Sequence, residues 1–91
     1  SDIVRAILKY LKTVPECFCW KEHGGMYGTA GIPDIICCYR GKFVAFEVKT
    51  ETGKTTALQE SVINKIQKCA GKAAVVRSVE NVKAALKEMV V

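Results

Sequence analysis

Apolar residues recur at helical spacing in two separate stretches of the chain. The first stretch, residues 2–13, begins with Asp2 as its predicted N-cap and stops before Pro15. The second runs from about residue 56 to residue 69, and Gly71 is predicted to end it. The apolar positions are Ile3, Val4, Ile7, Leu8 and Leu11 in the first stretch, and Leu58, Val62, Ile66 and Cys69 in the second.

A third helix is predicted near the end of the sequence, with Ser78 as its N-cap. Its apolar positions are Val79, Val82, Leu86 and Met89. The residues just before it, 73–77, are short, apolar and β-branched, which predicts a strand.

Three further strands are predicted between the first two helices, at residues 17–21, 34–39 and 43–48. Four glycines fall within residues 22–31, so this segment is predicted to be a loop. Arg40-Gly41 predicts a two-residue turn that joins the second and third strands into a hairpin.

The elements follow the order α-β-β-β-α-β-α within one domain, residues 1–91. Three strands that meander and a fourth that returns after a helix predict an α/β fold, with a mixed four-stranded sheet flanked by helices. A chain of this length has a modest core, which a partner subunit would enlarge. The final residues, Met89, Val90 and Val91, are apolar and favour such a partner.

Charge and apolar content narrow the functional classes. Lysine and arginine number 14 against 9 acids, and the net charge of +5 favours an acidic partner such as nucleic acid. No apolar run approaches the roughly 18 residues of a membrane span. No charged-then-apolar leader is seen, so a soluble, intracellular protein is expected.

The chain has an odd number of cysteines, at positions 17, 19, 37, 38 and 69. None forms a C-x-x-C pair, and the single His23 does not complete a zinc site of ordinary spacing. The five thiols are therefore predicted to be small buried side chains in a reducing compartment.

Three charged residues stand at the ends of the predicted hairpin strands. With Arg40-Gly41 as the turn, the register places Asp34 opposite Glu47, and Lys49 shares their face. In one interpretation Lys49 neutralises an acid at a solvated sheet edge. In the other, the paired carboxylates bind Mg²⁺ or Mn²⁺, which prefer oxygen ligands and keep several waters.

The set Gly31-Ile32-Pro33-Asp34, then Glu47-Val48-Lys49, then Gln59 on the next helix, closely resembles the PD-(D/E)XK nucleases. Within that superfamily the chain is similar to the virus-type replication–repair nuclease (VRR-NUC) domain, and the resemblance covers nearly the whole chain. It implies a restriction-endonuclease-like core and a metal-dependent endonuclease that hydrolyses DNA.

The resemblance also assigns roles to residues of the chain. Asp34 and Glu47 would hold Mg²⁺ or Mn²⁺, with the Val48 backbone carbonyl as a further ligand. Lys49 would be the catalytic lysine, and Gly31 and Lys49 would approach the substrate. Gln59 would organise the site, although Thr56-x-x-Gln59 also matches a helix capping box.

The family pattern usually adds an acid on the first helix. Asp2 and Glu22 are the candidates here, and they are interpreted as an N-cap and a solvated loop charge. His23 is interpreted as an ordinary loop residue, and Trp20 as a core residue instead of a base-stacking platform.

A stand-alone chain of this length resembles the small viral branch of the family, encoded by phage or prophage. That branch implies a homodimer that acts on branched DNA such as Holliday junctions. The alternative hypothesis is a non-catalytic DNA-binding or assembly module that retains the nuclease fold. The presence of Asp34, Glu47 and Lys49 together argues against this module.

Overall fold

Helices and strands alternate along the chain in the predicted order. A computed structural model describes residues 1–23 and 28–90. The elements are α1 (Asp2–Leu11), β1 (Cys17–Lys21), β2 (Ile35–Tyr39), β3 (Lys42–Val48), α2 (Ala57–Lys68), β4 (Lys72–Val76) and α3 (Val79–Glu88). Part of the predicted glycine-rich loop, residues 24–27, lies outside the described residues, as does Val91.

The four strands form one mixed sheet in the order β1-β2-β3-β4. The first three strands are antiparallel, and β4 pairs with β3 in parallel. Tyr39 faces Lys42 across the turn, as predicted, because Arg40 and Gly41 both have positive φ, at 52° and 81°. A two-residue turn with two positive φ values matches the twist of the strands and fixes their register.

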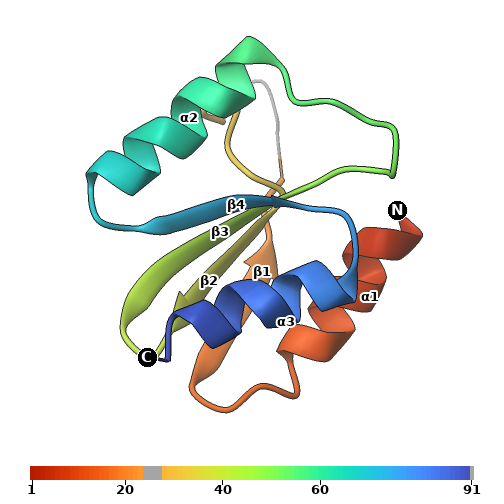
Figure 1. Cartoon of the computed structure of the whole chain (residues 1–91), viewed down its shortest axis with the longest axis vertical. Coiled ribbons are helices and arrows are strands. Elements are labelled where there is room, and N and C mark those ends of the chain that lie inside the picture. The colour runs from red at the N-terminus through yellow and green to blue at the C-terminus, as the bar shows by residue number, and fades with distance from the viewer. Residues whose placement is uncertain (24–27, 91) are drawn as a thin grey trace.

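Helices cover both faces of the sheet, with α2 on one side of the strands and α1 and α3 on the other (Figure 1). Neighbouring residues of a strand point to opposite faces, so Ile35 and Ile36 belong to different clusters. The face under α1 and α3 is built from side chains that include Ile7, Leu11, Ile35, Val44, Phe46, Val82 and Leu86. The face under α2 is smaller and contains Ile36, Ala45, Ile63 and Ala73.

The start of α1 differs from the prediction. Ser1 is the N-cap, because its hydroxyl accepts a hydrogen bond from the Val4 N–H at 3.2 Å. Asp2 lies in the first turn, where its carboxylate is 2.7 Å from Arg5. The helix ends at Leu11 and not at residue 13, and the N–H groups of Thr13 and Val14 bond to carbonyls three positions back in a tighter turn.

The other helix ends follow the sequence more closely. Ser78 caps α3 through a hydrogen bond from the Asn81 N–H, as predicted. At the end of α2 the left-handed residue is Ala70, with φ 68°, and not the predicted Gly71. The Gly71 N–H instead reaches back to the Ile66 carbonyl at 2.9 Å, which closes the last turn.

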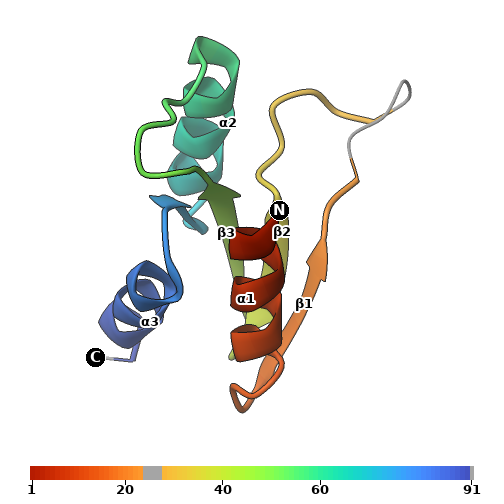
Figure 2. The same cartoon turned by 90° about the vertical axis from the view of Figure 1, so that its right-hand side faces the viewer.

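The interpretation of Trp20 as a core residue is wrong. Trp20 is 42% exposed, and its neighbour Phe18, with a ring centroid 5.6 Å away, is 70% exposed. Both residues lie on the face that α2 covers. However, α2 packs over β4 and the two inner strands, and β1 lies on the far side of the molecule from α2 and α3 (Figure 2). Aromatic side chains on this edge strand therefore stay in contact with solvent.

The prediction that all five cysteines are buried is also wrong. Cys37 is buried and Cys17 and Cys19 are half-buried, but Cys38 and Cys69 are exposed. Burial raises the pKa of the first three thiols, which keeps them protonated and unreactive. All five are free thiols, which agrees with the absence of a disulfide pattern in the sequence.

Candidate active site

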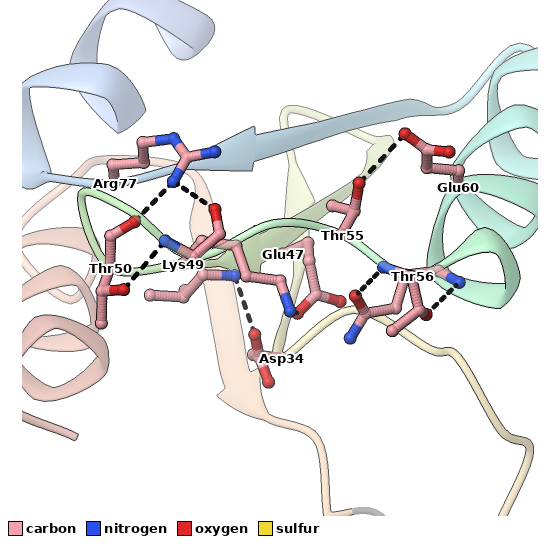
Figure 3. A network of polar contacts seen from close by, with 11 residues as sticks. Asp34, Glu47, Lys49, Thr50, Thr55, Thr56, Glu60 and Arg77 are labelled. Carbon is pink, nitrogen blue, oxygen red and sulfur yellow. Dashed lines mark hydrogen bonds and ion pairs between the residues drawn. The ribbon is translucent and has the colours of Figure 1, made fainter.

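The hairpin brings the two predicted carboxylates together at one end of the sheet. The last β2–β3 pair is Ile35 with Phe46, so Asp34 lies one position beyond the ladder, next to Glu47. One carboxylate oxygen of Asp34 accepts a hydrogen bond from the Val48 N–H at 2.8 Å (Figure 3). Asp34 is thereby fixed to the neighbouring strand by a backbone contact, which holds its carboxylate beside Glu47.

Glu47 is the buried polar residue of the described chain, with 2% of its surface exposed. Its Oε1 atom has no hydrogen-bond partner among the described residues. The Lys49 ammonium lies 3.9 Å from Oε2, which is longer than a charge-assisted hydrogen bond. A carboxylate that is 2% exposed does not fit the interpretation of a solvated sheet edge, although Lys49 lies within ion-pair distance of it.

The environment of Glu47 disfavours its charged form. Burial, a hydrogen bond to Asp34 and the negative charge of Asp34 together raise the pKa of Glu47 to about 8, while Lys49 lowers it by a smaller amount. A protonated Glu47 can share its proton with Asp34, whereas an ionised Glu47 repels that carboxylate. Without a bound cation, one of the two carboxyl groups therefore keeps its proton.

The stability of the metal-free protein is expected to fall as the pH rises from about 5 to 8. The pKa of Glu47 is higher in the folded protein than its ordinary value of 4.5, so the folded state binds the extra proton over this range. Stability from this proton is complete below the ordinary pKa and is lost as the pH passes the folded pKa. We expect a decrease in melting temperature of at least ~4 °C, which corresponds to about 1 kcal/mol for a domain of this size.

Thermal melts in EDTA at several pH values measure this effect. The matched control is Glu47→Gln, which keeps the size of the side chain and cannot ionise. Its melting temperature should change much less over the same pH range. Parallel pH profiles for the two proteins would show that Glu47 is not the titrating group.

The donor set fits a hard divalent cation that keeps its waters. Two adjacent carboxylates, one with a buried oxygen that lacks a hydrogen-bond partner among the described residues, are suited to Mg²⁺ or Mn²⁺. Among residues 1–23 and 28–90, no group of three His, Cys, Asp or Glu side chains is placed to hold a metal. A cation bound by Asp34 and Glu47 would complete its shell with water, backbone or substrate oxygens.

Glu22 lies closer to this site than its interpretation as a solvated loop charge implies. Its backbone N–H donates to the Asp34 carbonyl at 2.8 Å, and its carboxylate accepts from the Trp20 indole at 3.1 Å. Glu22, His23 and Asp34 line one cavity of about 350 Å³. Asp2 does not line this cavity. Its side chain is 96% exposed on α1 and pairs with Arg5.

Gly31 lines the same cavity and packs against α2. Its φ is +82°, and a Cβ atom added there would lie 2.8 Å from the Leu58 side chain and 3.1 Å from that of Val62. Glycine is required here so that the segment before Asp34 can pass close to the helix. The segment's position, and with it that of Asp34, depends on this contact.

The capping-box prediction for Gln59 is confirmed. The Gln59 side chain accepts from the Thr56 N–H at 3.0 Å, and the Thr56 hydroxyl accepts from the Gln59 N–H at 3.1 Å. This reciprocal pair sets where α2 begins after the polar loop. A contribution of Gln59 to the site stays a prediction.

Sequence reasoning missed Arg77. This residue follows β4, and its guanidinium donates hydrogen bonds to backbone carbonyls of residues 50–53, the loop directly after Lys49 (Figure 3). No local sequence pattern predicts this contact, because Arg77 and the loop residues that it binds are 24 to 27 positions apart in the sequence.

Comparison with known proteins gives structural relatives only. No protein-family model matches the chain, and no curated protein matches it by sequence. A solved structure described as "VRR_NUC domain" matches with a TM-score of 0.77 and 20% identity, over 94% of this chain and 91% of the other. Another, described as "VRR_NUC domain protein", matches with a TM-score of 0.71 and 18% identity, over 96% and 84% of the two chains. The chain therefore has the fold of the solved VRR_NUC domains.

Proposed function

We propose that this protein is a metal-dependent nuclease that hydrolyses phosphodiester bonds in DNA. The observation that carries the proposal is Glu47, buried beside Asp34 with an oxygen that lacks a hydrogen-bond partner in the described part of the chain, and with Lys49 on the same face. This arrangement occurs in a chain that shares its fold with two structures named for the VRR_NUC domain. The name of those structures and the donor set support the same chemistry.

Each residue of the site has a distinct role in this proposal. Asp34, Glu47 and the Val48 carbonyl would hold Mg²⁺ or Mn²⁺. When bound, such an ion polarises the phosphate and lowers the pKa of a coordinated water. Lys49 places a positive charge beside the carboxylates, where it can stabilise the negative charge that develops on the phosphate during in-line attack. Gly31 and Lys49 line the approach of the substrate, and Gln59 supports the site through the start of α2.

DNA fits the charge of the chain, and branched DNA is the proposed substrate class. The net charge of +5 attracts phosphates without regard to sequence. A domain of 91 residues has little surface for reading base edges, so selectivity should come from the shape of the DNA.

No helix among the described residues has the length and apolar character of a membrane span.

Cleavage is expected only with a divalent cation, and most strongly on branched DNA. A gel assay with linear, single-stranded, flapped and four-way DNA, each in Mg²⁺, Mn²⁺ and EDTA, measures both properties. Four-way junctions of different sequence should be cut at similar rates. Loss of the preference for branches would remove the structure-specific part of the proposal. If calorimetry shows metal binding but no DNA is cut, a non-catalytic DNA-binding module becomes the better function.

We also propose that the protein is a homodimer. The support from the structure is a set of large apolar side chains on its surface, including Phe18, Phe43 and Leu58, which are 70%, 47% and 51% exposed. At the C-terminal end, Met89 packs on the core and Val90 is 51% exposed. A two-fold dimer would present two Asp34–Glu47 sites to the two strands of a junction.

Light scattering at micromolar concentration is expected to give the mass of a dimer, about twice the 10.0 kDa of the chain. Four-way junctions should then receive paired cuts in opposite strands. A monomer throughout the active concentration range would contradict the dimer and favour an enzyme that nicks one strand.

A further inference from the structure

We infer that Arg77 is a positioning residue for Lys49. It would act by holding the loop of residues 50–53, so that the Lys49 ammonium stays beside Glu47. This inference rests on the proposed function, because it concerns the rate of DNA cleavage. Arg77 is not itself placed against the carboxylates; its hydrogen bonds are to the loop.

The contact is made by one end of the guanidinium. The Nη1 atom donates to the carbonyls of Thr50 and Gly53, the latter at 2.7 Å, and lies 3.4 Å from that of Glu51. A cationic donor shared between carbonyls of one loop fixes their relative positions, and charge-assisted bonds of this kind are about twice as strong as neutral ones. Within the loop there is one internal turn, in which the Gly53 N–H donates to the Thr50 carbonyl and hydroxyl.

The loop in turn passes close to the Cβ atom of Lys49. A Cβ atom added at Gly53 would lie 3.7 Å from the Lys49 Cβ and 3.0 Å from the Thr50 hydroxyl. The backbone at Gly53 is therefore folded back toward the Cβ atom of Lys49. Because Arg77 holds the Gly53 carbonyl, it also fixes the part of the loop that lies near the Lys49 Cβ atom.

Arg77 is itself well anchored. Its backbone N–H donates to the Asn81 side chain in α3 at 2.8 Å. The preceding residue, Val76, accepts the Lys49 N–H at 3.0 Å, which is the last contact before the chain leaves the sheet. The end of β4 thus fixes Lys49 on its amide side through a backbone bond, and on its carboxyl side through the Arg77 guanidinium.

The test compares Arg77→Ala with Arg77→Lys. Arg77→Ala is expected to speed amide hydrogen exchange of residues 50–54 and to slow single-turnover cleavage of a four-way junction at least ~10-fold, since a displacement of ~1 Å can cost ~100-fold. DNA affinity, measured in Ca²⁺, should change less than ~3-fold, because the residue acts on the rate and not on binding. Arg77→Lys retains charged donors and should recover part of the rate. If Arg77→Ala is unfolded at the assay temperature, Arg77→Lys is compared with the wild type, and a rate equal to wild type with unchanged exchange overturns the inference.

The matched control is Arg5→Ala, which removes the same side chain from an exposed ion pair on α1. It should leave exchange, rate and affinity unchanged. Weaker DNA binding by Arg77→Ala, with a salt dependence reduced by about one phosphate contact, would show that Arg77 binds the substrate instead. Wild-type cleavage by Arg77→Ala overturns this inference alone, whereas a wild-type protein that cuts no DNA overturns the proposed function and this inference together.

Discussion

Lys49→Ala is expected to lower the single-turnover rate of DNA cleavage by about 100-fold or more. The Lys49 side chain is 18% exposed, and its ammonium lies 3.9 Å from Glu47, so a phosphate bound to a cation that the carboxylates hold would come next to it. Its positive charge is needed most when negative charge builds on the phosphate, so its loss affects the transition state more than the bound substrate. Metal affinity should change only a few-fold.

The control for this variant is Lys54→Ala, which removes an exposed lysine from the same polar loop. It should cut at a rate close to wild type. Calorimetry with Mn²⁺ and DNA binding in Ca²⁺ separate the possible causes of a loss in activity. If Lys49→Ala weakens DNA binding and leaves the cleavage rate intact, Lys49 anchors a phosphate and has no catalytic role.

Asp34→Asn is expected to abolish detectable cleavage and to leave the melting temperature of the metal-free protein unchanged or raised. The amide oxygen of asparagine can still accept the Val48 N–H, so the backbone contact is kept. The substitution removes the negative charge that helps to raise the pKa of Glu47. It also removes a proposed metal ligand, so calorimetry should show that Mg²⁺ and Mn²⁺ bind much more weakly.

Asp2→Asn makes the same chemical change at an exposed position and is the control, with activity close to wild type. Thermal melts in EDTA and the junction assay give both readings for each protein. A mutant that melts well below wild type would mean that the Asp34 charge stabilises the fold. A mutant that still cuts would exclude Asp34 from the metal site.

Much of this arrangement could be predicted because its signals are local. The Arg40-Gly41 turn fixes the hairpin register, and that register alone places Asp34 beside Glu47. The capping box of Thr56 and Gln59 involves only four consecutive residues, and the cap of α3 involves four as well. The predicted cap of α1 lies one residue too late, at Asp2 instead of Ser1.

The failures concern contacts between distant parts of the chain. Trp20 has a large apolar side chain of the kind that is usually buried, but its exposure depends on how far α2 extends over the sheet. Glu22 joins the cavity beside Asp34 through the β1–β2 pairing and the backbone bond beyond it. Arg77 bonds to a loop more than twenty positions earlier in the sequence, and neither hydrophobic periodicity nor a motif predicts that contact.

The parallel pairing of β3 with β4 has a consequence for the newly made protein. Asp34, Glu47 and Lys49 all leave the ribosome before α2, and well before Val76 and Arg77, which fix Lys49 and its loop. The unfinished chain therefore contains every charged group of the site but not the strand that orders them. Parallel pairing across a helix forms late, since the intervening loop must close first. A nascent chain that has not yet reached Arg77 is accordingly expected to lack an ordered Lys49, so the proposed cleavage of DNA should begin only after β4 has been synthesised.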